Sequence, residues 1–335
     1  MASRRPTSFD IAAAAGVSQP TVSRALSGNK AVSEETRRRV VAAAEKLNYK
    51  VDRNASNLRS GASRTIALLF FEDPTRDESG INPFYLSMLG ALTRAAASAD
   101  YDLLISFQQL SADWHTDYED SRKADGIILL GYGNYLQARP RLEQLIEQGT
   151  HFVRWGATVE GQVGTTVGSD NRDGGRQAGR HLVKRGCRRI AFLGTADAGA
   201  PEFLERYEGL KDALGEAGLE PVGHYDAIPT EESGRAALAA LMHDDLDVDG
   251  IFAASDLIAI GARQELTDRG RAVPNDVALI GFDDSNAAHH TGLTSVNQDT
   301  RRAAEMLIDT LLTKLEDRAP ESVVLPVELV VRDSA

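Results

Sequence analysis

Residues 18–24 carry polar side chains whose types and spacing suit hydrogen bonding to the edges of DNA bases. They lie in the segment TSFDIAAAAGVSQPTVSRALSG, residues 7–28, which predicts two short helices joined by a tight turn. Two helices packed through their apolar faces can place the second in the DNA major groove. An ordinary helical hairpin is the alternative interpretation. The side chains expected to face outward are Gln19, Thr21, Ser23 and Arg24.

The same segment marks where its helices begin and end. Thr7 and Asp10 match a T-x-x-D capping pattern, and Gly16 suits the left-handed residue that ends the first helix. Ser18 suits the cap of the second helix. Pro20 is tolerated in a first turn, where the N–H that it lacks would have no partner. The residues predicted to pack the helices together are Ile11, Ala12, Ala15, Val22, Ala25 and Leu26.

A second set of polar and aromatic residues follows a series of short apolar runs. From Thr65 onward, runs of strand length alternate with amphipathic helical patterns. This alternation predicts two Rossmann-like lobes, each a parallel sheet covered on both faces. Ligands of such sheets bind beyond the carboxyl ends of the strands. Carboxylates and arginine for hydroxyl groups, with an aromatic face for C–H groups, are the chemistry of sugar binding. Strand-end candidates are Tyr132, Trp155, Ser255, Asp256, Asp283 and Asp284, with Phe84 and Tyr85 at a helix start.

The elements that must position these residues can be placed by periodicity. Ser33 caps a third helix near the N-terminus, residues 34–47, with Val40, Val41, Ala44 and Leu47 on its apolar face. Arg37, Arg38 and Arg39 on this helix are either a solvated face or phosphate contacts. Strands are predicted at 65–71, 102–107, 126–131, 151–155, 189–194, 250–255, 277–282 and 325–331. Helices are predicted at 84–99, 135–149, 171–186, 201–218, 231–244, 256–270 and 299–316.

Charge is distributed unevenly along the 335 residues. Residues 1–61 hold eleven Lys or Arg and five Asp or Glu, a net charge of +6, and the remainder carries -18. A basic head on an acidic body is expected of a DNA-binding module attached to a separate core. The single cysteine, Cys187, excludes an intrachain disulfide. No signal peptide and no membrane-length apolar run occur, so we predict a cytoplasmic protein.

Enzyme signatures are missing from the sequence. No serine lies in a G-x-S-x-G elbow, and no Walker loop or post-strand G-x-G-x-x-G occurs. Gly174 and Gly175 begin a predicted helix and could hold a phosphate, although this signal is generic. His289 and His290 lack partners at metal-ligand spacing. We therefore predict no enzymatic activity, no metal and no cofactor.

Three N-terminal motifs resemble the headpiece of LacI-type (lactose-repressor family) transcription regulators. They are GVSQPTVSRALSG, VSEETRRRVVAAAEKLNY and ASNLRSG, in this order and spacing. The resemblance covers the whole chain, because the remainder resembles the family's periplasmic-binding-protein-like core. It implies a homodimer that binds the inverted repeat of double-stranded operator DNA, most simply as a repressor. The implied DNA-binding residues are Thr7, Ser18, Gln19, Pro20, Thr21, Ser23, Arg24, Asn29, Ala55 and Leu58.

The resemblance also divides the chain into parts. Residues 1–50 match the helix-turn-helix headpiece, and residues 51–63 match a hinge helix that forms on operator DNA. A short helix of this kind is unstable alone in water. Leu58 matches the leucine that the family inserts between base pairs from the minor groove. Residues 64–335 match the effector-binding and dimerisation core, with a first lobe at 64–167 and 298–324 and a second at 168–297 and 325–335.

Effector-binding residues follow from the resemblance in the same way. Asp283 in GFDDS and Arg206 in RYEG match the family's effector-binding aspartate and arginine, and Asp170 matches a further polar contact. Ser255 replaces a commoner asparagine. Phe84 and Tyr85 match an aromatic pair beside the ligand, whereas Tyr132 and Trp155 are candidates on physical grounds. Ordinary packing is an equal alternative for every aromatic.

The kind of effector is indicated less directly. A long connection at residues 72–81 either closes over a larger ligand or is a solvated loop. With Trp155, it favours a disaccharide or longer saccharide as effector. A corepressor such as a nucleobase or sugar phosphate is an alternative, as is a free-standing sugar receptor. The chain ends soon after its last predicted strand, which favours a dimer over a tetramer.

Overall fold

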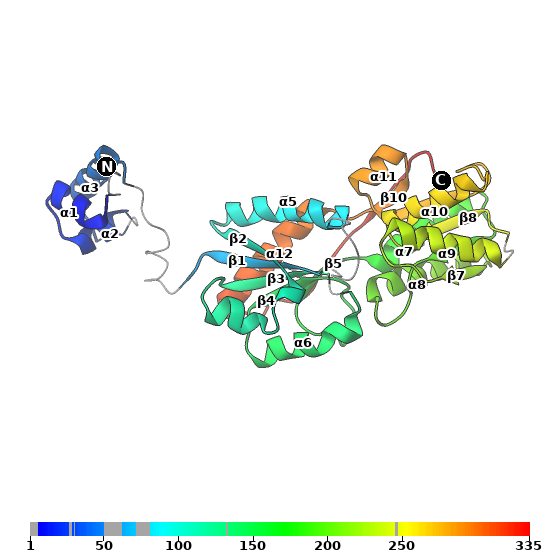
Figure 1. Cartoon of the computed structure of the whole chain (residues 1–335), viewed down its shortest axis with the longest axis horizontal. Coiled ribbons are helices and arrows are strands. Elements are labelled where there is room, and N and C mark those ends of the chain that lie inside the picture. The colour runs from blue at the N-terminus through cyan, green and yellow to red at the C-terminus, as the bar shows by residue number, and fades with distance from the viewer. Residues whose placement is uncertain are drawn as a thin grey trace. The chain divides into compact units, whose positions relative to one another are not determined.

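The structure, a computed structural model, describes residues 6–26, 29, 31–49, 62–71, 81–131, 133–244 and 247–335. The chain forms two compact units, Met1–Ser63 and Arg64–Ala335, which we call the headpiece and the core (Figure 1). The predictions that concern Tyr132, the loop at 72–80 and the hinge residues Ala55 and Leu58 lie outside the described residues.

The headpiece contains three helices, α1 (Ser8–Ala15), α2 (Gln19–Leu26) and α3 (Glu34–Lys46). Ile11, Val22 and Val40 are fully buried at the centre of their packing. The predicted helices are therefore confirmed within one or two residues. One core prediction is wrong, because Val41 is 39% exposed and Ala43 is buried in its place. Val40, Ala43 and Ala44 lie on the same face of α3, which packs inward, whereas Val41 lies to the side of that face.

The first lobe of the core is built on a sheet of order β11-β5-β4-β3-β1-β2, in which every pairing is parallel. Ile66, Leu68 and Phe70 pack with α5 and α12, whereas Ala67 and Leu69 pack beneath α6 and its neighbours. This alternation buries both faces, as expected for a parallel sheet. The strands are β1 (Thr65–Phe70), β2 (Asp102–Phe107), β3 (Gly126–Leu130), β4 (Phe152–Trp155), β5 (Thr166–Ser169) and β11 (Val323–Leu325). The helices are α5 (Pro83–Ser98), α6 (Tyr135–Glu147) and α12 (Thr300–Leu315).

The second lobe is built on a sheet of order β12-β10-β9-β8-β6-β7, with only β12 antiparallel. Phe282 of β9 faces α7, and the neighbouring Gly281 lies against Asp256 of α10, so the two helices cover opposite faces. The strands are β6 (Ile190–Leu193), β7 (Gly223–Tyr225), β8 (Gly250–Ala253), β9 (Ala278–Asp283), β10 (Thr294–Asn297) and β12 (Glu328–Val330). The helices are α7 (Asn171–Lys184), α8 (Pro201–Glu216), α9 (Glu231–His243), α10 (Asp256–Asp268) and α11 (Asn286–Thr291).

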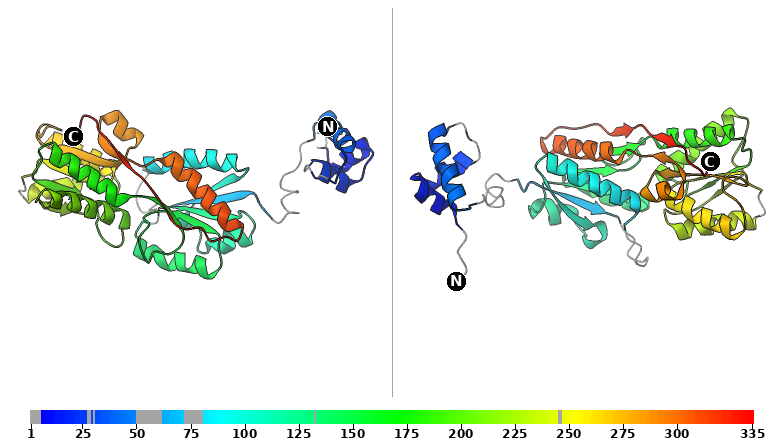
Figure 2. Two further views of the ribbon diagram at one scale, coloured as in Figure 1. Left: turned by 180° about the vertical axis from the view of Figure 1, so that it is seen from behind. Right: turned by 90° about the horizontal axis from the view of Figure 1, so that it is seen from above.

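The chain passes between the two sheets three times: after β5, after β10 and after β11. Figure 2 shows α12, which follows the second passage, lying beside α5 of the first lobe. The predicted last strand at Leu325–Val331 does return to the second lobe, as β12, but it is shorter than expected. Its first residue, Leu325, instead ends β11 of the first sheet, and Pro326, whose ring nitrogen cannot donate to a ladder, follows directly.

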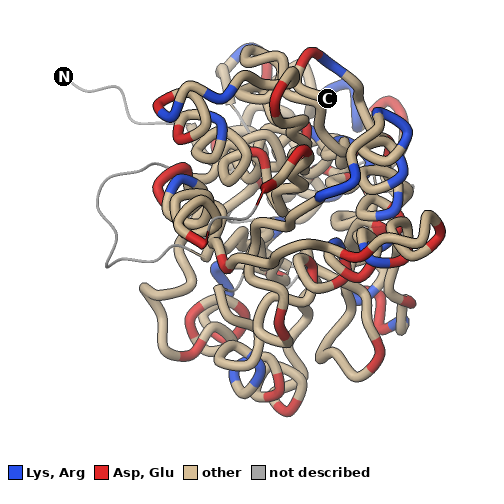
Figure 3. Tube along the Cα trace, turned by 90° about the vertical axis from the view of Figure 1, so that its right-hand side faces the viewer, with Lys and Arg blue, Asp and Glu red and all other residues tan. Residues whose placement is uncertain are grey.

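Several short elements were absent from the prediction, namely β5, β7, β10, α11 and the short helical turns Gln108–Leu110 and His115–Asp120. Acidic and basic residues alternate along the helices and loops of the core (Figure 3). Among the described residues, no helix has the length and apolar character needed to cross a membrane.

Candidate nucleic-acid interface and effector site

The turn between α1 and α2 is fixed by local hydrogen bonds. Thr7 and Asp10 form the predicted capping box, with the Thr7 amide donating to Asp10 Oδ2 at 2.7 Å. Gly16 ends α1 at φ 64°, a left-handed conformation that favours glycine. Ser18 Oγ accepts from the amide of Thr21 at 3.4 Å. These contacts set the angle at which α2 leaves the turn.

Two arginines of α3 hold the headpiece together. Arg39 donates to the carbonyl of Ala15, at the end of α1, at 2.5 Å. Arg37 donates to the carbonyl of Asn29 at 3.0 Å and pairs with Glu34 at 2.9 Å. Arg38 is exposed. Arg37 and Arg39 therefore have contacts within the headpiece. Arg38 has an exposed side chain and remains the candidate for a phosphate contact.

The described DNA-binding candidates gather around α2. Ser18, Pro20 and Arg24 are exposed, and Gln19, Thr21 and Ser23 are half-buried. Gln19 Nε2 donates to Ser8 Oγ at 3.3 Å, which ties this side chain to α1. Asn29 is exposed, and its Oδ1 accepts from the amide of Ala31 at 2.9 Å. Thr7 serves as the α1 cap.

In the core, Arg206 of α8 is a buried cation at the carboxyl ends of the second sheet. It is 4% exposed, and its Nε donates to Asn171 Oδ1 at 2.8 Å. Its guanidinium carbon lies 3.6 Å from the centre of the Phe282 ring, a cation–π contact. Burial lowers the pKa of Arg206, and the nearby Asp283 and Glu202 oppose that shift.

Asp283 ends β9 beside this arginine. Its Oδ1 accepts from Gln298 Nε2 at 2.7 Å, and its backbone has φ 113°. A non-glycine residue in this region is strained, and such strain occurs where a side chain must be held in one direction. Burial raises the pKa of Asp283 well above the usual range of an aspartate, although Arg206 opposes the shift.

A polar network fixes the turn that follows Asp283. The buried Asp256 accepts from Ser295 Oγ at 2.6 Å and from the amide of Ser285 at 2.7 Å. Asp284 pairs with Arg332 at 2.6 Å and accepts from Asn297 at 3.0 Å. These contacts tie strands β9 and β10 and the C-terminal segment together. Asp256 and Asp284 are therefore structural, and of the three carboxylates Asp283 has the largest electrostatic effect on Arg206.

The aromatic candidates divide into core and site. Phe84 and Trp155 are buried in the first lobe with ring centres 5.8 Å apart, which agrees with packing. Tyr85 is half-buried, and its ring centre lies 5.4 Å from that of Phe84. Burial raises the pKa of Tyr85, and the charges of Glu202 and Asp283 raise it further. Tyr85 of the first lobe thus lies near the charged groups of the second.

Two of the predicted polar contacts cap helices. Asp170 Oδ1 accepts from the amide of Asp173 at 2.9 Å at the start of α7. Ser255 is buried, and its Oγ accepts from the amide of Ile258 at 3.4 Å at the start of α10. Capping accounts for both residue types, although each residue also follows a strand end.

Sequence reasoning missed a direct contact between the lobes. Glu202, one turn before Arg206 on α8, accepts from the amide of Ala157 in the first lobe at 2.7 Å. The amide of Tyr135 donates to the carbonyl of Gly199 at 2.7 Å close by. The spacing of Glu202 and Arg206 could have shown that they share a helix face. The partner of Glu202 on the first lobe, the amide of Ala157, could not be found from the sequence.

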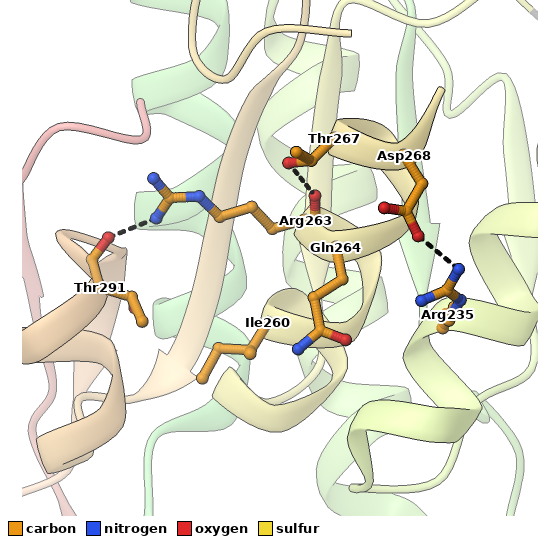
Figure 4. Close-up of a pocket in the computed structure, with 7 residues that line it drawn as sticks. All are labelled: Arg235, Ile260, Arg263, Gln264, Thr267, Asp268 and Thr291. Atoms are coloured by element: carbon orange, nitrogen blue, oxygen red, sulfur yellow. Dashed lines mark hydrogen bonds and ion pairs between the residues drawn. The ribbon is translucent and has the colours of Figure 1, made fainter. Parts of the chain in front are cut away.

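Other candidates lie apart from this cluster. A hollow of about 560 Å³ between α9, α10 and α11 contains none of the predicted effector residues. Figure 4 shows Arg235 paired with Asp268 and Arg263 with Thr291 at its wall. Cys187 is buried, and burial raises its pKa. Among the described residues, no His, Cys, Asp and Glu side chains form a cluster of metal ligands.

Two family models match the chain. The model of bacterial regulatory proteins of the lacI family matches residues 9–52, and that of a periplasmic binding protein-like domain matches residues 180–335. The HTH-type transcriptional regulator CelR of Thermobifida fusca is 35% identical over 99% of this chain and 98% of its own length. The ribose operon repressor of Escherichia coli (strain K12) is 27% identical over 92% of this chain and 93% of its own length.

Solved structures agree in fold. A CelR–cellobiose complex superposes with a TM-score of 0.71 at 32% identity, covering 99% of this chain and 100% of that one. The lac repressor dimer, bound to operator and the anti-inducer ONPF, gives a TM-score of 0.81 at 22% identity, with 99% of each chain covered. The predicted fold class, a helical headpiece with a two-lobed α/β core, is therefore confirmed.

Proposed function

The chain belongs to the lacI family of bacterial regulatory proteins, and we propose that it is a homodimeric repressor whose operator binding is controlled by a saccharide held between the core lobes. Residues 1–50 bind DNA, 51–63 form the hinge and 64–335 bind the effector and the second copy. The protein acts in the cytoplasm, where operator DNA lies, and it is not an enzyme. Its recognised relatives are transcription regulators.

The DNA-binding half of the proposal is supported by the exposed face of α2. Two copies of α2, one from each subunit, would enter adjacent major grooves and read an inverted repeat. Arg24 is exposed there and can bridge O6 and N7 of a guanine. Pro20 can offer only apolar contact, for example to a thymine methyl group.

Replacing Arg24 with alanine should remove sequence preference more than overall DNA affinity. We expect the preference for an operator selected from a random duplex library to fall by roughly 1–3 kcal/mol, while salt-sensitive binding to a scrambled duplex persists. Fluorescence anisotropy with both duplexes measures this. Arg38→Ala is the matched control, expected to weaken both duplexes alike. Equal weakening by Arg24→Ala would contradict a base-reading role.

One observation carries the effector half of the proposal: the buried Arg206 lies close enough to Asp283 and to Tyr85 of the other lobe for their charges to interact. A guanidinium and a carboxylate together can bind the paired hydroxyl groups of a sugar. Glu202 adds a second carboxylate, and two acids around one arginine disfavour a phosphate or another anion. A neutral saccharide fits better than a sugar phosphate, and the CelR relative was solved with cellobiose.

The effector controls DNA affinity through its preference for one arrangement of the lobes. Contacts to both lobes favour the closed arrangement, which alters the separation of the two hinges in the dimer. A shift from 1:99 to 99:1 requires about 5.5 kcal/mol of differential binding. Arg206 and Asp283 on one lobe, with Tyr85 on the other, could supply part of this energy.

A thermal-shift screen of the purified protein against mono-, di- and trisaccharides, nucleobases and sugar phosphates tests the proposal. A ligand that binds only the native state raises the melting temperature. We expect cellobiose or another disaccharide to do so and to change operator affinity in a binding assay. If only nucleobases or sugar phosphates raise it, the saccharide proposal is wrong and the DNA-binding assignment stands.

Binding of the saccharide found in that screen should release protons at pH 7. Burial raises the pKa of Asp283, so part of its population is protonated, and a hydroxyl donor favours the ionised form. The affinity should therefore rise with pH until the carboxyl is fully ionised. Calorimetry in buffers of different ionisation enthalpy counts the protons. Identical enthalpies in all buffers would show that Asp283 is already ionised or makes no contact.

A further inference from the structure

We propose that Asn171, at the start of α7, is a positioning residue that orients the Arg206 guanidinium toward the effector. This inference rests on the proposed function in one respect, since it takes Arg206 to bind the effector. Neither the strand-end rule nor the family resemblance pointed to Asn171. Its role follows from the contacts of two buried side chains.

The amide of Asn171 has one possible orientation. Asn171 is 5% exposed, and its Nδ2 donates to the carbonyl of Ser169 at 3.0 Å. Its Oδ1 accepts from Arg206 Nε at 2.8 Å. A flipped amide would place Nδ2 against the N–H of Arg206 and Oδ1 against the Ser169 oxygen, two repulsive contacts. Ser169 therefore fixes which end of Asn171 faces the arginine.

The other contacts of Arg206 complete its restraint. Nη1 donates to the carbonyl of Ala254 at 2.5 Å, and the guanidinium stacks on Phe282. Stacking sets the plane of the guanidinium, and the bonds of Nε and Nη1 set its rotation within that plane. Nη2 makes no hydrogen bond to any residue that the structure describes, and Asp283 and Glu202 lie near the group. The donors left for a ligand are thus those of Nη2 and the second N–H of Nη1.

The backbone of Arg206 is held by the same helix that carries Asn171. A Cβ atom on Gly175 of α7 would lie 2.0 Å from the Arg206 carbonyl oxygen, so the two helices touch through their backbones. Helix α7 therefore contacts Arg206 at two points, its backbone through Gly175 and its guanidinium through Asn171. Without Asn171, the buried Nε–H would lose its acceptor, and the guanidinium could rotate toward Asp283 or Glu202 to regain one.

The exchange rate of the Arg206 Nε proton tests this orientation without any ligand. In full-length protein labelled with ¹⁵N-arginine, the signal is assigned by its loss in Arg206→Lys. We expect at least tenfold faster exchange in Asn171→Ala. In Asn171→Asp we expect near-parent exchange, because its charged oxygen still accepts from Arg206 Nε and the stronger bond offsets the lost contact with Ser169. Asn286→Ala is the matched control, because Asn286 is also the first residue of a helix but is exposed. Unchanged exchange in Asn171→Ala overturns the proposal.

Titration with cellobiose gives the second readout. Asn171→Ala should weaken cellobiose binding about tenfold, the expected loss for a hydrogen bond to a charged group, and Asn171→Asp should stay within about threefold of the parent. If Asn171→Ala does not fold, Asn171→Asp provides the test. The proposal is wrong if Asn171→Asp loses both the slow exchange of the Arg206 Nε proton and the affinity for cellobiose. If the parent binds no saccharide, the proposed effector is wrong, and the exchange rates still decide the positioning role.

Discussion

The variant Asp283→Ala is expected to bind operator DNA with the affinity of the parent protein and to lose its response to the effector. The alanine removes the carboxylate that lies near Arg206 and accepts from Gln298. It takes away an acceptor for the sugar and leaves the buried arginine with one neighbouring carboxylate fewer. Together these losses should weaken effector binding about 100-fold or more.

Two further variants separate binding from folding. Asp283→Asn keeps the side-chain shape, tolerates the positive φ better than alanine does and should lose affinity in the same way. Glu220→Gln removes an exposed carboxylate of the second lobe and should leave the response unchanged. The measurements are effector titration, operator affinity with and without effector, and melting temperature. A normal effector response in Asp283→Asn would remove this carboxylate from the site.

The headpiece could be predicted closely because its signals are local. The capping box of Thr7 and Asp10 and the left-handed Gly16 act within one helical turn, so the sequence alone indicated both boundaries of α1. The alternation of apolar strands and amphipathic helices was equally local and predicted two lobes. The sequence predicts both Val40 and Val41 in the core, but neighbouring residues point to different sides of a helix, and tertiary packing buries only Val40.

The missed strands have weak local signals. Thr166–Ser169 and Gly223–Tyr225 are short and contain glycine; β5 also pairs with β11, which is distant in the sequence, and β7 is an edge strand. In β5, a Cβ atom on Gly168 would lie 1.9 Å from the Gly156 carbonyl oxygen, a close approach that no local pattern encodes. The contact between Glu202 and Ala157 depends on how the lobes fold and therefore could not be predicted.

The glycines at the start of α7 illustrate the same limit. In the sequence, Gly174 and Gly175 were compatible with a phosphate-binding helix start. In the structure, both are buried, and Gly174 faces the ring of Phe282. Gly175 lies against the backbone of α8. Close packing explains both glycines without a ligand. The sequence shows that small residues are needed there, but only the fold shows which neighbour requires them.

Gly209→Ala should destabilise the core severely, although it adds a single methyl group. The new Cβ would lie 2.0 Å from the carbonyl oxygen of Arg172, and backbone at this crossing cannot move aside as a flexible side chain can. Helices α7 and α8 would have to separate, at a cost of about 3 kcal/mol in the free energy of unfolding. Because Asn171 and Arg206 lie on these two helices, the separation should also weaken effector binding.

Gly215→Ala provides the matched control on the same helix. A Cβ on Gly215 meets no atom within 4 Å, so alanine there should raise stability by about 0.5–1 kcal/mol through its better helix propensity. Calorimetric melting of the full-length variants should therefore move in opposite directions from the parent. Equal melting temperatures for the two variants would show that the α7–α8 contact yields easily. The rigidity on which the orientation of Arg206 depends would then have to come from its side-chain contacts alone.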